Sequence, residues 1–249
     1  VLLSAFEQAE HYLLRSLAIR EALFGPEHAT VAECLNLVGL WHQFQGEFLL
    51  ARPCYERALA IWQRGLGPDH EQTGTAHNNL GYLLFHLQEF EQAQLHLRRA
   101  LTICRRHAGL RNEKLARILN NLGYMLSHSG APLPARRYLR LALAIREQLL
   151  GASPATAQTL NNLGEVLFAL GDYPGAQRCH ERALAMRDAV FGQANLHSAE
   201  SLRNLGLVLA AQGDRPAARD YLERALALSQ ATAGEQHIET AWKQAALGT

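Results

Sequence analysis

Asn78-Asn79-Leu80-Gly81 is the stretch that decides the fold, because close copies of it recur at a fixed distance along the chain. The copies are Asn36-Leu37-Val38-Gly39, Asn120-Asn121-Leu122-Gly123, Asn161-Asn162-Leu163-Gly164, Arg203-Asn204-Leu205-Gly206 and Ala245-Ala246-Leu247-Gly248. Their glycines follow one another at spacings of 42, 42, 41, 42 and 42 residues. A constant period of this size predicts a solenoid of stacked supersecondary units rather than a globular domain with one core.

The second half of each unit carries two columns of small residues. The first column is Ala9, Ala51, Ala93, Ala135, Ala176 and Ala218, and the second, seven residues later, is Ser16, Ala58, Ala100, Ala142, Ala183 and Ala225. Between them a larger residue recurs, as Leu13, Tyr55, Leu97, Leu139, His180 and Leu222. Seven residues are two helical turns, so both small residues lie on one face of a second helix.

The Leu-Gly pair, the paired alanines and the helix-turn-helix rhythm together resemble the tetratricopeptide repeat. The usual repeat of that family has about 34 residues, and the longer form found here is similar to that of kinesin light chain. Arrays attached to bacterial signal-transduction ATPases of the STAND/NB-ARC type share this longer form. The resemblance implies an all-α fold, a right-handed α-solenoid of about six antiparallel helix pairs.

Turn residues set the expected helix boundaries. Glycines mark the short turns inside a unit, and Gly-Pro-Glu/Asp-His segments at 25–28 and 67–70 mark the links between units. First helices are expected near 29–45, 71–88, 112–129, 154–170 and 196–212, and second helices near 6–23, 48–65, 90–107, 132–150, 173–190 and 215–232. The repeat units are then 1–28, 29–70, 71–111, 112–153, 154–195 and 196–234, with a partial unit at 235–249. Because the repeat columns continue to both ends, we expect residues 1–249 to be one array and a fragment of a longer one.

Composition and motifs exclude several classes of protein. Net charge is +1 and no apolar run reaches the roughly 18 residues of a membrane helix, so the expected location is the cytoplasm. The four cysteines have no CxxC spacing, which favours buried thiols over disulfides or a metal site. The lysines Lys114 and Lys243 fit no phosphate loop, and neither HExxH nor GxSxG occurs. We therefore expect no catalytic site, no cofactor and no metal. His28 and His70 lie one period apart and are expected to shape the links.

In the resembling family, first helices line a concave groove that holds an extended ligand. The position three residues before the column glycine and the position just after it carry that role. Their spacing of four places them on one helical face, and side-chain amides can both donate to and accept from a peptide backbone. Aromatic residues one turn further would add apolar anchors. The candidate groove residues are Asn36, Asn78, Asn120, Asn161, Arg203, Tyr82, Tyr124, Glu165, Phe85, His86, His128 and Phe168.

The alternative is that the asparagines belong only to the repeat consensus. A triple alanine variant of Asn78, Asn120 and Asn161 is expected to lose partner binding with little change in thermal midpoint.

Positive charge is concentrated in the middle of the chain. Between Gln94 and Arg146 the basic residues are Arg98, Arg99, Arg105, Arg106, Arg111, Lys114, Arg117, Arg136, Arg137, Arg140 and Arg146, and Glu113 is the only acid. Arg117 precedes Asn120 by three residues and so shares its helical face, which adds it to the candidate groove. Such a patch would attract an acidic ligand, although a solvated or intermolecularly paired face explains it as well. Stacking platforms for bases are absent, so nucleic acid is an unfavoured partner.

These observations predict a non-enzymatic protein–protein interaction scaffold that binds an extended, acidic peptide segment in its groove. One alternative is the sensor array of a larger STAND-type ATPase, in contact with its own missing domains. Another is a structural solenoid that assembles end to end. Peptide recognition by rigid helices would cost conformational entropy in the peptide alone.

Overall fold

The computed structural model describes residues 2–107, 112–192 and 196–233. Within these ranges the chain is entirely α-helical, and no strand occurs. The helices are α1 (Leu2–Phe24), α2 (Ala29–Phe44), α3 (Phe48–Gly65), α4 (Glu71–His86), α5 (Phe90–His107), α6 (Glu113–His128), α7 (Pro132–Leu150), α8 (Pro154–Ala169), α9 (Tyr173–Phe191), α10 (Leu196–Gln212) and α11 (Arg215–Ala233). The all-α fold class predicted from the repeat is confirmed.

The predicted helix boundaries agree closely with the observed ones. The largest difference is at α1, which begins at Leu2 instead of residue 6. Arg111 and the partial unit at 235–249 lie outside the described residues, so the single array over 1–249 stays a prediction.

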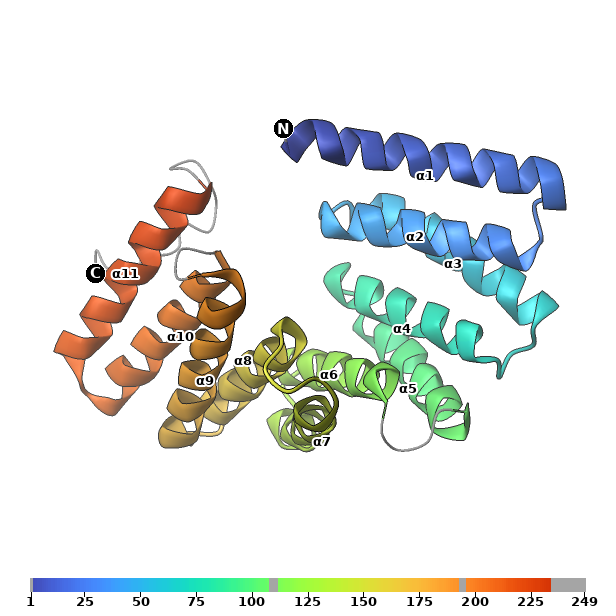
Figure 1. Ribbon diagram of the computed structural model, residues 1–249. Helices are drawn as coiled ribbons and strands as arrows, with labels where there is room; N and C mark the ends of the chain where they lie inside the picture. The colour runs from blue at the N-terminus through green and yellow to red at the C-terminus, as the bar shows by residue number, and fades with distance from the viewer. Residues whose placement is uncertain (1, 108–111, 193–195, 234–249) are drawn as a thin grey trace. The chain divides into compact units, whose positions relative to one another are not determined.

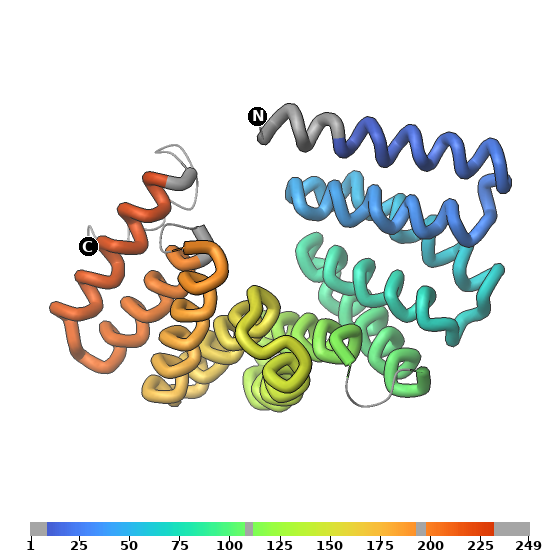
Figure 2. Tube along the Cα trace, in the orientation of Figure 1, coloured from blue at the N-terminus to red at the C-terminus, as the bar shows by residue number. Residues whose placement is uncertain are grey.

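The chain divides into two compact units, 1–125 and 126–249, and the boundary falls near the end of α6. In the first unit α2 pairs with α3 and α4 with α5, while α1 packs on α2 (Figure 1). In the second unit α8 pairs with α9 and α10 with α11, and α7 packs on α8 (Figure 2). Each unit is therefore a series of helix hairpins with contacts mainly between neighbours along the chain.

The column position must be glycine, because a large side chain of the second helix lies directly against it. A Cβ atom added to Gly39 would be 2.7 Å from a ring carbon of Tyr55, and one added to Gly81 would be 2.7 Å from Cγ of Leu97. Gly206 meets Leu222 in the same way, and Gly164 meets the ring of His180. The contact between this glycine and the larger residue sixteen positions later thus packs the two helices of a hairpin against each other.

The two small columns complete this packing. Ala51, Ala58, Ala93 and Ala100 are fully buried in the first unit, and Ala176 and Ala183 are fully buried in the second. Small side chains at these points let the two helices of a hairpin approach closely, so the larger residue between them can reach the glycine.

The turn inside a hairpin requires a residue with the left-handed backbone conformation, in which φ is positive. Gly46, Gly130, Gly171 and Gly213 have φ between 77° and 91° in these turns. Gln88 stands at the same repeat position in the α4–α5 turn and has φ 65°. A non-glycine residue is strained there, so this turn departs from the repeat pattern while keeping its geometry.

The link histidines cap helices. Nδ1 of His28 accepts from the backbone N–H of Thr30 at 3.3 Å, and Nδ1 of His70 accepts from that of Gln72 at 3.2 Å. A side-chain acceptor at the helix N-cap satisfies one backbone donor that has no partner in the helix. This geometry explains why the histidine recurs with the period.

Outward-facing arginines hold the same links. Arg57 donates to the carbonyl of Pro26 at 3.1 Å, and Arg99 to that of Pro68 at 3.3 Å. Arg99 also forms an ion pair with Asp69 at 2.6 Å. These contacts give the regularly spaced arginines a structural role.

The cysteines are free thiols, with Cys34, Cys104 and Cys179 buried and Cys54 half-buried. Among the described residues, no group of three or more His, Cys, Asp or Glu side chains is arranged to hold a metal ion. None of the described helices is long and apolar enough to cross a membrane.

Candidate functional site

One face of α4 carries a continuous stripe of polar and aromatic side chains. Glu71, Thr75, Asn78, Tyr82 and His86 follow one another at helical spacing. The next first helix, α6, carries Lys114, Arg117 and Tyr124. Charged and polar groups lie toward the N-terminal ends of both helices and aromatic groups toward their C-terminal ends. These two parts are called here the charged zone and the aromatic zone of the α4–α6 face.

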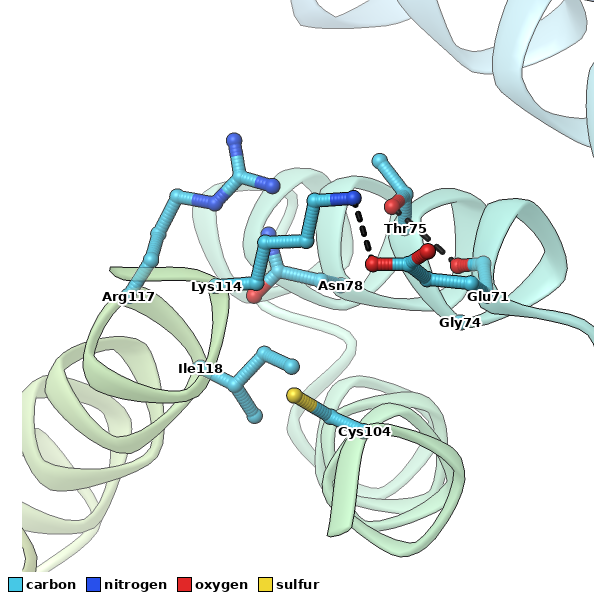
Figure 3. A pocket seen from close by; sticks show the side chains of 8 residues that line it. All are labelled: Glu71, Gly74, Thr75, Asn78, Cys104, Lys114, Arg117 and Ile118. Carbon is cyan, nitrogen blue, oxygen red and sulfur yellow. Dashed lines mark hydrogen bonds and ion pairs between the residues drawn. The ribbon is translucent and has the colours of Figure 1, made fainter. Parts of the chain in front are cut away.

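The charged zone surrounds a small pocket, which Figure 3 shows from close by. Lys114 and Arg117 reach from α6 toward α4, while Cys104 and Ile118 lie on the opposite side (Figure 3). Nζ of Lys114 is 2.6 Å from a carboxylate oxygen of Glu71, and this hydrogen bond lowers the pKa of Glu71. The pocket therefore presents two cations and one carboxylate.

A short side chain in the repeat opens this pocket. The position of Cys104 is occupied by the longer side chains Arg20, Trp62, Arg146 and Arg187 in α1, α3, α7 and α9, and by Ser229 in α11. Arg146 and Arg187 are buried there and donate to the following first helix, for example Arg146 to Oγ1 of Thr159 at 2.6 Å. Cys104 is too short to fill the equivalent space, and burial raises the pKa of its thiol. The pocket thus lies where α5 has a short side chain and four other second helices have a long one.

The aromatic zone is a cluster of rings from α3, α4, α5 and α6. His86 stacks on Phe48 with ring centroids 4.7 Å apart and planes at 2°, and it lies 4.5 Å from Tyr82. Phe85 contacts Tyr124 edge to face at 5.2 Å, and Phe90 at 5.7 Å. Phe85 is buried, while Tyr82, His86, Tyr124 and Phe48 keep part of their surface exposed. Half-exposed rings held by their neighbours form a rigid apolar surface that an apolar side chain could cover.

The asparagine columns connect successive repeats. Nδ2 of Asn79 donates to Oδ1 of Asn36 at 2.8 Å, and Nδ2 of Asn121 to Oδ1 of Asn78 at 3.1 Å. In the second unit, Nδ2 of Asn204 donates to Oδ1 of Asn161 at 3.0 Å. The second asparagine of one repeat therefore donates to the first asparagine of the repeat before it.

Burial separates these asparagines from the other candidate groove residues. Asn78 is 2% exposed and Asn161 is 0% exposed, and Asn120 is also buried, whereas Asn36 is half-buried. A ligand that used the buried amides would have to compete with bonds already made inside the protein. Their role as ligand-binding groups stays a prediction, and their role between repeats is an observation.

The second unit brings Asn161, Glu165 and His180 together with residues of α10. Nδ2 of Asn161 donates to Oε1 of Glu165 at 3.0 Å and to Oε1 of Glu200 at 3.2 Å, and Nδ1 of His180 contacts Oδ1 of Asn161 at 3.1 Å. Burial, with the nearby charge of Glu200, raises the pKa of Glu165. Glu200 is paired with the buried guanidinium of Arg187 at 2.8 Å. This network therefore contains two carboxylates, one of them paired with a guanidinium, whereas the pocket of the α4–α6 face contains two cations and one carboxylate.

The remaining predicted groove residues of the second unit, Arg203, His128 and Phe168, have different surroundings. Arg203 is half-buried, and its charge acts on Glu165, as does that of the exposed His128. Phe168 contacts Tyr173 at 5.4 Å between ring centroids. Phe168 therefore packs within its own hairpin and does not extend an aromatic surface of the kind seen in the first unit.

The central basic residues have different surroundings. Arg99 and Arg106 both pair with Asp69, Lys114 pairs with Glu71, and Arg146 is buried. Arg98, Arg105, Arg137 and Arg140 are exposed to solvent. Most of the central basic residues are thus either solvated or paired within the chain, and Arg117 lines the pocket. Pairing with another molecule stays a prediction.

Sequence reasoning missed several residues of the α4–α6 face. Glu71 and Thr75 lie seven and three residues before Asn78, so extending the helical stripe by two turns would have found them. Phe48 and Phe90 come from second helices, and no spacing within the sequence connects them to His86 or Phe85.

Known proteins agree with this repeated architecture. One family model described as tetratricopeptide repeat matches residues 2–52, 36–106 and 114–189, and another of the same description matches 198–239. The crystal structure of BtubC (BKLC) from P. vanneervenii is similar, with 28% sequence identity and a TM-score of 0.74 over 92% of this chain and 93% of that one. No curated protein sequence matches the chain.

Two further structures show the fold alone, because their sequence identity is low. A kinesin light chain protein of Podosopora anserina with nearly identical TPR-like repeats has 18% identity and a TM-score of 0.68, covering 82% of this chain and 97% of its own. The Cut9-Hcn1 hetero-tetramer of the APC/C has 16% identity and a TM-score of 0.73, covering 97% of this chain and 39% of its own.

Proposed function

Because the chain belongs to the tetratricopeptide repeat family, we propose that it is a non-enzymatic scaffold that binds an extended segment of a partner protein on its α4–α6 face. Proteins with this repeat generally act as interaction scaffolds. The observation that carries the choice of face is the charged zone lying beside the aromatic zone on the same two helices. No other surface of the first unit combines the candidate groove residues in this way among the described residues.

The chemistry of the face favours an acidic segment with an apolar side chain nearby. Lys114 and Arg117 would donate charge-assisted hydrogen bonds to a carboxylate of the partner, which are stronger than neutral ones. Tyr82, His86 and Tyr124 would cover an aromatic or aliphatic side chain, and such anchors contribute most of the energy in protein interfaces. The helices are already rigid, so the partner alone loses conformational freedom.

The buried asparagines stabilise this face by connecting the helices that form it. Asn78 holds Asn121 of the next first helix in place, and this fixes the separation of α4 and α6 on which both zones depend. We retain Asn36, Asn78 and Asn120 as proposed groove residues of the first unit, and Asn161 and Arg203 as proposed groove residues of the second. The half-buried Asn36 and Arg203 would be in direct reach of a ligand.

In the second unit the groove residues would accept a different group. Glu165 and Glu200 share the amide of Asn161, so a cationic or amide side chain of the partner fits there better than a carboxylate. The acidic preference is accordingly proposed for the α4–α6 face only.

Panning of a random peptide library on the immobilised chain tests the proposal. We expect enriched peptides to share an acidic residue near an aromatic or aliphatic one, and their affinity to fall as salt rises. A Lys114→Gln/Arg117→Gln variant should bind them at least about tenfold more weakly, because tenfold corresponds to about 1.4 kcal/mol and two charged contacts are lost.

The matched control is Arg98→Gln/Arg105→Gln, which removes the same charge from the exposed surface of α5. This control should bind like the unchanged chain. If no shared motif is enriched, or if both double variants lose affinity equally, the α4–α6 face is not the binding surface and only non-specific attraction to basic residues remains.

The alternative of a sensor array in a larger STAND-type ATPase stays a prediction. It would place a folded domain, rather than a peptide, on the same helices, and the sequence upstream of Val1 decides it by containing or lacking a phosphate loop. The cytoplasmic location likewise stays a prediction.

A further inference from the structure

The turn between α4 and α5 contains a strained residue where the other turns of its kind contain glycine. Gln88 has φ 65°, and among the described residues it is the only one other than glycine with a positive φ. The glycines at the same repeat position are Gly46, Gly130, Gly171 and Gly213. The left-handed conformation brings Cβ too close to the following carbonyl oxygen, so a glutamine adopts it only at a cost in stability.

The Gln88 side chain does not offset this strain within the fold. Nothing lies within 4 Å of a Cβ added to any of the four glycines, so the position is open in those turns. Gln88 is exposed, and its side chain forms no hydrogen bond or ion pair with any residue that the structure describes. The backbone forms the turn, because the N–H of Gln88 donates to the carbonyl of Phe85 at 3.0 Å, just as that of Gly46 donates to Gln43 at 3.1 Å. Glycine would therefore make the same turn without strain.

The strained turn adjoins the aromatic zone of the α4–α6 face. The backbone of Gln88 is bonded to Phe85, and Phe90 follows two residues later, with the rings of Phe85 and Phe90 in contact at 5.7 Å between centroids. The next residue, Glu89, forms an ion pair with Arg52 of α3 at 2.6 Å. The Gln88 side chain thus extends from a backbone that is fixed on both sides, at the end of α4 where the aromatic zone lies.

An aromatic surface leaves the polar groups of a bound peptide without strong hydrogen-bonding partners. The rings can cover an apolar side chain, but they do not replace the water bound to the peptide groups on either side of it. A peptide group that loses water on docking and gains no partner weakens binding. A glutamine amide both donates and accepts, so it can pair with the N–H or with the C=O of an extended backbone.

We propose that Gln88 is a ligand-binding residue of the α4–α6 face, and that its amide bonds to the backbone of the partner segment beside the residue that covers the aromatic zone. This inference rests on the proposed function of that face. The strain at Gln88 is then offset in the complex alone, as it is for strained residues at other binding sites. Glutamine at this position makes the free chain less stable than glycine would, and it makes the complex tighter.

Two variants separate the amide from the strain. Gln88→Gly removes both, whereas Gln88→Met keeps the strain and an unbranched side chain but lacks the amide. Labelled peptides enriched by panning on the unchanged chain are titrated against each variant. Both variants should bind them about three- to tenfold more weakly, as the loss of one hydrogen bond predicts.

Thermal unfolding distinguishes a ligand-binding role from a structural one. Gln88→Gly should have a thermal midpoint up to about 4 °C above that of the unchanged chain, because the strain is gone. Its stability and its affinity should therefore change in opposite directions, whereas loss of a structural contact would lower both. The matched control is Gly171→Gln, which places the strained residue in the corresponding turn of the second unit. This control should have a lower midpoint and bind the peptides like the unchanged chain.

The proposal is overturned if either Gln88 variant binds the peptides as tightly as the unchanged chain, or if Gln88→Gly lowers the thermal midpoint. When Lys114→Gln/Arg117→Gln loses affinity and the Gln88 variants do not, the α4–α6 face remains the binding surface and the role of Gln88 alone is refuted. If no peptide binds the unchanged chain, the proposed function is refuted and the role of Gln88 with it.

Discussion

At the scale of the residue, the asparagine columns show how one side chain serves two neighbouring repeats. Asn78 donates to Oδ1 of Asn79 at 3.1 Å and accepts from Asn121, while it is almost fully buried. A buried amide that loses its partner retains the cost of leaving water without the compensating bond. The bonds between repeats therefore matter more through the groups that they satisfy than through their own strength.

This geometry changes the expectation for an alanine substitution. The sequence alone predicts little change in thermal midpoint when Asn78, Asn120 and Asn161 are replaced together by alanine. The structure predicts that Asn78→Ala by itself lowers the free energy of unfolding by about 1–3 kcal/mol, since both partners of the amide are left short of a bond. Urea unfolding measures the loss. Gln63→Ala, at an exposed position of α3, is the control and should change stability by less than about 0.5 kcal/mol. Equal midpoints for the two variants would contradict the structural role.

At the scale of the element, the contact between a glycine and the larger residue sixteen positions later joins the helices of each hairpin. A Cβ at Gly81 would be 2.7 Å from Cγ of Leu97 and 3.1 Å from the backbone oxygen of Ala93. The side chain can turn only at a cost, and the backbone oxygen cannot move without shifting α5. Gly81→Ala should therefore destabilise the chain by about 1–3 kcal/mol, as overpacked cores do.

Gly65→Ala provides the matched comparison within the same unit. Gly65 is the last residue of α3, and nothing lies within 4 Å of an added Cβ. Alanine there should be neutral or stabilising by up to about 1 kcal/mol, because it reduces the freedom of the unfolded chain. Thermal unfolding of both variants checks the pair, and a Gly81→Ala midpoint at or above that of Gly65→Ala would refute the packing argument.

The repeat period made most of the elements predictable. Gly81 and Ala93 mark the helices by their spacing, and the observed boundaries of α4 and α5 follow the prediction within two residues. The α4–α6 face was predictable only in part. Tyr82 and Tyr124 follow from their position after the column glycine, but the stacking of Phe48 on His86 depends on tertiary contact between hairpins, which no periodicity encodes.

At the scale of the whole molecule, each unit contains a buried histidine, His77 or His180, where other repeats place an apolar side chain. His77 stands at the position of Leu35 and Leu119, and its Nδ1 is 2.9 Å from Nδ1 of His96. His180 stands at the position of Leu97 and lies on Gly164. Burial lowers the pKa of each to about 4, with the charges of His96 and Arg99 adding to the effect at His77 and those of Arg187 and Arg203 at His180.

Both units should therefore lose stability in weak acid. The unfolded histidines bind protons near pH 6.5 and the folded ones only near pH 4, so the unfolded state binds more protons between these values. Stability is full above about pH 6.5 and should fall by up to about 1.4 kcal/mol per pH unit for each histidine as pH decreases toward 4. Urea unfolding at several pH values between 7.5 and 5 measures this slope.

The substitutions His77→Leu and His180→Leu test the cause, since they restore the side chain that other repeats use. At His180 the change leaves Oδ1 of Asn161 still bonded to Asn204, so no buried acceptor is orphaned. The double variant should be less sensitive to acid than the unchanged chain, and the difference between them should vanish above pH 7 apart from a constant offset in stability. Parallel slopes for the two proteins from pH 7.5 to 5 would show that carboxylates, not these histidines, set the acid limit of the fold.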